Sequence, residues 1–209
     1  MDIIKSIKSS LSEKILDTQY QDLMSPVGDS RTYREKTDHH KVACVMALIH
    51  KKADKELYIT YIVRAASHPD DKHAGQIGFP GGKHEDDDNS LLDCALREVE
   101  EEIGIGRDRI QVLGQLSTLF VAPSNFLVYP YIGFIENEPT YIAQQSEVAD
   151  ILEVSLEELF AEHNKQEKTL TLGSGIESKV PGYDVKGHFL WGATAMMTSE
   201  LEHIYADSK

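Results

Sequence analysis

The sequence predicts an α/β/α sandwich of the α+β class, with a mixed sheet, and two patterns support this. Apolar runs of strand length occur at 42–49, 57–63, 110–119 and 128–135, and turn residues separate several of them. Between the second and third runs, apolar residues recur at helical spacing over 91–103. Several strands that surround one such helix favour a sheet covered by helices.

Length and composition limit the organisation of the chain. It has 209 residues, 41% of them hydrophobic, which suffices for one sizeable core. We expect an N-terminal helix and connector over 1–40 and the main domain over 41–209. A net charge of −14 argues against general nucleic-acid or membrane binding, which requires basic patches. Only two cysteines, no signal-peptide pattern and no long apolar run predict a soluble cytoplasmic protein.

Patterns outside the central strands predict the remaining elements. Residues 3–16 have the apolar spacing of an amphipathic helix, and 19–40 reads as an extended connector. Residues 156–163 predict a short helix, 168–186 two short strands, and 189–205 apolar positions at helical spacing. The apolar faces near both termini either pack on the domain or pair two copies as a homodimer.

The central helix carries a cluster of carboxylates. Ser90 is a suitable N-cap, and Gly104 can end the helix in a left-handed conformation. Glu98, Glu101 and Glu102 are spaced i, i+3 and i+4 and project opposite the apolar stripe. Like charges this close repel one another, so the cluster is either an ordinary solvated face or a site for a hard divalent cation such as Mg²⁺.

The order of the residues resembles a known motif. Gly82, Arg97-Glu98-Val99, Glu101-Glu102 and Gly104-Ile105 resemble the Nudix box of Nudix hydrolases, GX5EX7REUXEEXGU with U aliphatic. The acidic residue of the first half is Asp88, with one extra residue before Arg97. The resemblance implies metal-dependent hydrolysis of a nucleoside diphosphate linkage. It also implies the roles: Glu98, Glu101 and Glu102 would hold Mg²⁺ or Mn²⁺, Arg97 would orient them, and Glu101 is a candidate base.

The segment that precedes the box looks like that of the coenzyme A pyrophosphatase group, in which the same extra residue occurs. The matching residues include Arg64 and the run from His73 to Gly82. This resemblance implies cleavage of coenzyme A to 4′-phosphopantetheine and adenosine 3′,5′-bisphosphate. Its candidate substrate-binding residues are Arg64, Gly75, Gln76, Phe79, Gly81 and Gly82.

Asp71 stands where that group has a second arginine, so other readings stay open. A basic residue there would be the natural partner of a nucleotide phosphate. One alternative is a Nudix pyrophosphatase for ADP-ribose or another nucleotide, such as a nucleoside triphosphate. A second alternative is a Nudix-fold binding module without catalysis.

Glu147, the segment 121–126 and two aromatic residues each have both a structural and a functional interpretation. The resemblance points to Glu147 as an additional acid that reaches the metal or activates water, but by itself it is an exposed acid before a strand. Residues 121–126 have turn chemistry and also suit a substrate-facing loop. Phe126 or Tyr131 can stack on adenine, or belong to the core.

Overall fold

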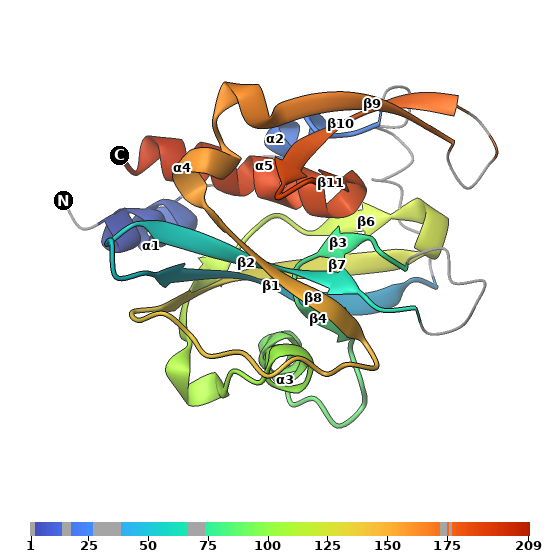
Figure 1. Cartoon of the computed structure of the whole chain (residues 1–209). Helices are drawn as coiled ribbons and strands as arrows, with labels where there is room; N and C mark the ends of the chain where they lie inside the picture. The colour runs from blue at the N-terminus through green and yellow to red at the C-terminus, as the bar shows by residue number, and fades with distance from the viewer. Residues whose placement is uncertain (1–2, 14–17, 27–38, 67–73, 172–174, 176) are drawn as a thin grey trace.

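A mixed sheet forms the centre of the molecule (Figure 1). The computed structural model describes residues 3–13, 18–26, 39–66, 74–171, 175 and 177–209. Within them an eight-stranded sheet has the main path β3-β2-β1-β7-β5, while β4 pairs with β1, β6 with β7 and β8 with β2. Its strands are β1 (Lys41–Lys51), β2 (Leu57–Arg64), β3 (Ile77–Gly78), β4 (Gly81–Lys83), β5 (Gln111–Gln115), β6 (Leu119–Val121), β7 (Phe126–Ile135) and β8 (Val148–Ser155).

Strand β1 organises the sheet because it pairs with three others. It runs parallel to β7 along ten residue pairs, from Lys41 opposite Phe126 to His50 opposite Ile135. It is antiparallel to β2 through one half and to β4 through the other. The predicted mixed sheet is therefore confirmed.

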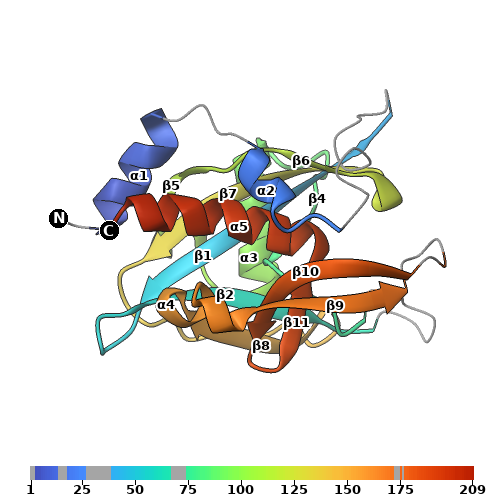
Figure 2. The ribbon, with the colours of Figure 1, turned by 90° about the horizontal axis from the view of Figure 1, so that it is seen from above.

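Helices cover both faces of the sheet (Figures 1 and 2). Helix α3 (Leu91–Ile103) lies on one face, and α5 (Gly192–Asp207) crosses the other with α1 (Ile3–Glu13) and α2 (Gln19–Asp22) against it. A separate antiparallel sheet, ordered β11-β10-β9, packs beside α5. The remaining elements are η1 (Arg107–Arg109), η2 (Ala122–Ser124), α4 (Leu156–Leu159), η3 (Glu162–Asn164), β9 (Lys165–Thr171), β10 (Glu177–Val185) and β11 (His188–Trp191). Among the described helices, none has the length and apolar character needed to cross a membrane.

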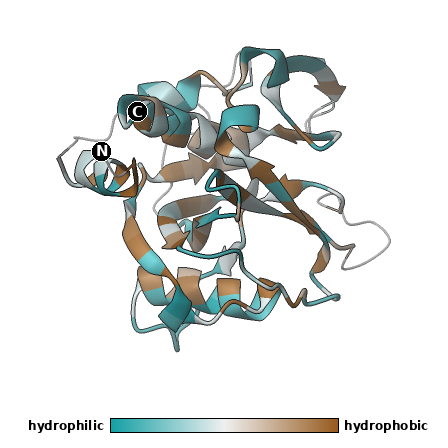
Figure 3. Ribbon diagram, turned by 60° about the vertical axis from the view of Figure 1, so that its left-hand side comes forward, coloured by the Kyte–Doolittle hydropathy of each residue, from teal (hydrophilic) through white to brown (hydrophobic). Residues whose placement is uncertain are grey.

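The two faces of the sheet contribute to two hydrophobic cores. The core on the α5 side contains Ile7 of α1, Tyr61 of β2 and Leu201 of α5, all fully buried. The core on the α3 side contains Met46 of β1 and Val99 of α3, also fully buried. Figure 3 shows hydrophobic and hydrophilic residues alternating around α3. Its apolar stripe fixes the helix on the sheet and leaves the carboxylates at the edge of the contact.

Helix α3 begins and ends where the sequence predicts. The Ser90 side chain accepts a hydrogen bond from the Asp93 N–H, as an N-cap does. Gly104 has φ 71° and ψ 23°, a left-handed cap whose N–H bonds to the Glu100 carbonyl. Cys94 is fully buried on this helix and belongs to the α3-side core.

Two sequence predictions were wrong because tertiary contacts override the local pattern. The strand expected at 110–119 splits into β5 and β6, since the Ser117 N–H leaves the ladder to donate to the Glu200 carboxylate. The connector expected at 19–40 begins with the helical turn α2. There, Gln21 donates to both the Ser117 carbonyl and Glu200.

Other predicted elements differ mainly in their bounds. The N-terminal helix is described as far as residue 13, and residues 14–17 and 27–38 lie outside the described part of the chain. The short helix expected at 156–163 is two pieces, α4 and η3, because the chain leaves the helix after Phe160. Strand β11 was not predicted. The turn expected at 121–126 is confirmed as η2 followed by Asn125 with φ 56°.

Replacing the α3 cap tests how much local capping contributes to the fold. We expect Ser90→Ala to lower the free energy of unfolding by about 1 kcal/mol, because the Asp93 N–H loses its acceptor. For a chain of this size, that corresponds to a melting temperature lower by about 2–4 °C. Thermal denaturation followed by circular dichroism measures it, with Ser90→Asp as the cap-retaining control. Equal melting of both variants would contradict the assignment.

Candidate functional site

The carboxylates of α3 rest on the glycine turn that forms β4. The Gly81 N–H donates to Oε2 of Glu102 over 2.8 Å. Gly82 lies directly against Glu98, and a Cβ atom there would overlap that carboxylate. Only glycine permits this approach of backbone and side chain at Gly82. The two adjacent glycines therefore decide where two of the three predicted metal ligands lie.

The three glutamates of the box differ sharply in exposure. Glu98 is 8% exposed and Glu102 is 2% exposed, whereas the Glu101 side chain is 57% exposed. Burial raises the pKa of Glu98, and it raises the pKa of Glu102 to about 8 against the pull of the Gly81 N–H. Charge repulsion adds to this effect, because Glu101 and Glu147 raise the pKa of Glu98, and Glu98 and Glu147 raise the pKa of Glu102.

Arg97 connects the carboxylates of the box. Its Nη1 lies 2.9 Å from both Glu98 Oε1 and Glu101 Oε2. Its Nε and Nη2 donate hydrogen bonds to the Asp88 carboxylate at 2.8 and 3.1 Å. This bidentate pair lowers the pKa of Asp88 to about 2. A further bond reaches the Lys83 carbonyl at 3.3 Å. Arg97 thus contacts two of the predicted ligands and fixes the loop before α3.

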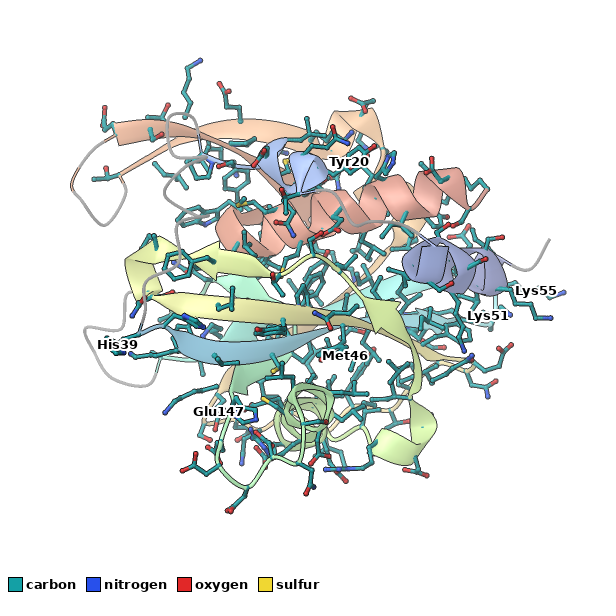
Figure 4. The ribbon with its side chains drawn as sticks, turned by 180° about the vertical axis from the view of Figure 1, so that it is seen from behind. Tyr20, His39, Met46, Lys51, Lys55 and Glu147 are labelled. Carbon is teal, nitrogen blue, oxygen red and sulfur yellow. The ribbon has the colours of Figure 1, made fainter. Side chains whose placement is uncertain are left out.

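Glu147 enters the site on a loop that runs beside α3. Its carbonyl accepts from the Ala65 N–H at 2.8 Å, and its negative charge raises the pKa of both Glu98 and Glu102. The Gln144 N–H of the same loop donates to the Glu102 carbonyl at 2.9 Å. Figure 4 shows Glu147 on the same side of the molecule as His39, near the start of β1. Glu147 is therefore close enough for its charge to act on Glu98 and Glu102.

In the segment before the box, some residues lie beside the carboxylates and one lies in the core. Arg64 ends β2, and its positive charge lowers the pKa of Glu102. Gly75 and Gln76 form backbone hydrogen bonds with Arg64, at 2.9 Å each. Phe79, by contrast, is 4% exposed and stacks on Tyr61 with ring centroids 5.0 Å apart. The Phe79 ring therefore packs in the core, and its role in substrate binding stays a prediction.

Several other candidates can now be placed. Asp88 was not predicted as a site residue, although the acidic position of the box was the signal that identifies it. Phe126 packs on the α5-side core and Tyr131 on the α3-side core, each partly buried. Residues 71–73, which contain Asp71, lie outside the described part of the chain.

The donor set suits a hard divalent cation. In this conformation, no three His, Cys, Asp or Glu side chains among the described residues converge as a ligand set. Arg97 instead holds Glu98 and Glu101, and a raised pKa favours the protonated form of Glu102. Buried carboxylates that repel one another need a neutralising cation, and carboxylate oxygens are the ligands Mg²⁺ and Mn²⁺ prefer. These residues therefore fit such an ion.

Comparison with protein families shows to which family the chain belongs. The NUDIX domain family matches residues 39–172, which contain the glycine turn, α3 and Glu147. The chain belongs to the Nudix family. Strand β10, strand β11 and helix α5 lie beyond the matched residues, so the layer over the α5 side of the sheet extends past the Nudix domain match.

Known relatives of this Nudix chain include two bacterial proteins called uncharacterized Nudix hydrolase NudL. The protein from Yersinia enterocolitica is 37% identical over 130 residues, covering 62% of this chain and 66% of that protein. The one from Pectobacterium atrosepticum is 36% identical over 135 residues, with coverages of 62% and 67%. The chain thus spans just under two thirds of the Yersinia relative.

A solved structure shows the same fold. The MutT/nudix family protein from Enterococcus faecalis superposes with a TM-score of 0.50 at 18% identity, covering 90% of this chain and 71% of that one. The predicted Nudix-type sandwich is thereby confirmed.

The buried Glu102 makes the stability of the metal-free protein depend on pH. Its folded-state pKa of about 8 lies above the ordinary 4.5, so between these values the folded protein keeps a proton that the unfolded chain releases. Stability should therefore fall as the pH rises from 4.5 to 8. Glu102→Gln has no carboxyl group to titrate, so at pH 8 we expect its free energy of unfolding to exceed that of wild type by on the order of 4 kcal/mol.

Urea unfolding with EDTA at both pH values measures this difference. Most of the advantage of Glu102→Gln should be gone near pH 4.5. Glu101→Gln, at an exposed carboxylate, is the matched control and should change stability little at either pH. An advantage of equal size at both pH values would contradict the burial of an ionisable group at Glu102.

Proposed function

We propose that the chain is a metal-dependent pyrophosphohydrolase of nucleoside diphosphate derivatives, with coenzyme A as its substrate. The observation that supports this most directly is the pair of buried glutamates, Glu98 and Glu102, held against the glycine turn. Glu101 and Glu147 add further carboxylates at the same place. A binding module would have no use for four mutually repelling carboxylates at one glycine turn.

Within this proposal the chain positions the diphosphate and the attacking water. Gly81 and Gly82 let the backbone approach the diphosphate closely, and Arg64 supplies a cation near Glu102. Arg97 orients Glu98 and Glu101 through its Nη1. Bound Mg²⁺ or Mn²⁺, held by Glu98, Glu101 and Glu102, would neutralise phosphate charge and lower the pKa of a water.

A carboxylate must also take the proton of the attacking water. Glu101 is exposed, and Nη1 of Arg97 orients its carboxylate from 2.9 Å. Glu147 lies on the loop beside α3, and its charge acts on Glu98 and Glu102. We propose both as candidate bases and favour Glu101, because its contact with Arg97 fixes the direction of its side chain.

The specific substrate rests on the residues before the box. Arg64, Gly75 and Gln76 occupy the positions that resemble the coenzyme A pyrophosphatase group, and their backbones are tied together beside the cluster. Cleavage would release 4′-phosphopantetheine and adenosine 3′,5′-bisphosphate. ADP-ribose or a nucleoside triphosphate is the second candidate, because Asp71 removes one expected cation. We further propose that 41–209 is the catalytic domain and that the cytoplasm is its location.

Product analysis tests the substrate. Purified protein with Mg²⁺ or Mn²⁺ is given coenzyme A, ADP-ribose, NADH and nucleoside triphosphates in parallel. We expect adenosine 3′,5′-bisphosphate to appear from coenzyme A faster than any other product, and EDTA to abolish it. A preference for ADP-ribose or a triphosphate would reject coenzyme A but keep the pyrophosphohydrolase. Absence of turnover from every compound, with metal bound, would support the binding module.

Charge-neutral substitution of the two candidate bases separates their roles. We expect Glu101→Gln to lower kcat by roughly 10²–10⁴-fold, the usual contribution of general base catalysis, with the melting temperature unchanged. Glu147→Gln should lower it less and leave the fold intact. Steady-state kinetics across pH measures both variants, with Glu100→Gln, at the neighbouring helix position, as control. Full activity of Glu101→Gln would remove it from the mechanism.

A further inference from the structure

Three neighbouring strands place two lysines and an aromatic ring in a row. Lys83 of β4 lies beside Ala43 of β1, and Lys41 of β1 lies opposite Phe126 of β7. The Lys41 ammonium lies over the Phe126 ring, 5.4 Å from its centroid. We call Lys83, Lys41 and Phe126 the cationic row.

All three members of the cationic row share one face of the sheet. Residues directly opposite each other on paired strands point the same way, and so do residues two apart on one strand. Ala43 and Phe126 both pack on the α5-side core, so Lys83 and Lys41 belong to that face as well. Diagonal neighbours across strands lie about 7–8 Å apart, a spacing that two lysine stems bridge easily.

The row carries uncompensated positive charge in an acidic protein. The chain has a formal net charge of −14. Among the residues the structure describes, neither Lys41 nor Lys83 has a carboxylate partner, and in this they resemble Lys168 and differ from five other lysines. The paired lysines are Lys51, Lys52, Lys165, Lys179 and Lys209. An anion is the natural missing partner of the cationic row.

The cationic row lies next to the carboxylate cluster but on the other face of β4. Lys83 follows Gly82 directly, and its carbonyl accepts from Arg97 at 3.3 Å. Gly82 faces Glu98 on the α3 side. Because successive strand residues point to opposite faces, the Lys83 side chain points away from the metal ligands. Figure 4 shows His39, just before β1, on the same side of the molecule as Glu147, with Lys51 at the far end.

This placement separates the row from the scissile group. An anion that binds metal at Glu98, Glu101 and Glu102 lies on the α3 side of β4. The cationic row would hold a second anionic group of the same substrate, one that extends round the edge of β4. Phe126 offers that part of the substrate an apolar surface, which suits a base or ribose next to the charge.

We propose that Lys41, Lys83 and Phe126 form a subsite for a ribose phosphomonoester of the substrate, distinct from the diphosphate that is cleaved. This inference rests on the proposed function and deepens it: the enzyme would prefer nucleotides that carry such a phosphate. In coenzyme A the group is the 3′-phosphate. A 2′-phosphate, as in NADPH, presents the same charge from a neighbouring position, so both sources are tested.

The test uses substrate pairs that differ only in this phosphate. We compare kcat/KM for coenzyme A with 3′-dephospho-coenzyme A, and for NADPH with NADH, in wild type, Lys41→Met, Lys83→Met and the double variant. Exposed ion pairs are individually weak. Each single substitution should therefore lower the preference for the phosphorylated member about three-fold, and the double about ten-fold. Rates on the unphosphorylated members should stay unchanged, and arginine at either position should restore the preference.

Lys168→Met is the matched control, because Lys168 lies over the Phe189 ring at 4.6 Å in the other sheet. A second measurement, called the binding arm, does not depend on turnover. Calorimetry compares the affinities of the same variants for adenosine 3′,5′-bisphosphate and for AMP. If wild type hydrolyses other nucleotides but not coenzyme A, the NADPH pair and the binding arm still decide the subsite.

Two outcomes overturn the subsite. The first is a wild type that does not discriminate within any pair. The second is an equal loss on both members of a pair, which would place the lysines on the scissile diphosphate instead. A preference confined to the 2′-phosphate pair would support the subsite while rejecting coenzyme A as its source.

Discussion

Burying two carboxylates against a glycine turn is the constraint on which the site depends. A carboxylate removed from water costs several kcal/mol unless hydrogen bonds or counter-charges replace its hydration. Here Glu102 accepts one hydrogen bond from the Gly81 N–H, and Glu98 accepts one from Nη1 of Arg97. Neither partner fully compensates the burial, as the raised pKa values of both groups indicate. The site is thus held in a state that a cation can relieve.

The rest of the fold makes that arrangement rigid. Strand β1 pairs with β4 and so fixes the turn, while the apolar stripe of α3 fixes the helix on the same sheet. Arg97 then ties the helix to the preceding loop through Asp88 and the Lys83 carbonyl. Because these contacts involve the sheet, the glycine turn and the loop before α3, the carboxylates are positioned by several elements and not by the helix alone.

Sequence reasoning predicted the parts that local chemistry decides. The bounds of α3 follow from Ser90 and Gly104, and the box order identifies the acidic cluster. It did not predict the unequal burial of Glu98, Glu101 and Glu102, because exposure depends on how far the glycine turn approaches the helix. The burial of the Phe79 ring was not predicted for a related reason: a motif gives the order of residues, but only the packing on Tyr61 shows which way the ring points. The split of the 110–119 strand likewise depends on a distant carboxylate at Glu200.

The loop beside α3 has a consequence for local unfolding. Its Ile142 and Gln144 amides bond to the last helical carbonyls, of Ile103 and Glu102, and Ile142 packs on Gly104. We therefore expect the end of α3 to open together with the loop, because separating the helix end breaks the loop contacts. Helix end and loop form one cooperative opening unit. Since Glu102 lies in one half and Glu147 in the other, slow amide exchange in either half would report the integrity of the whole cluster.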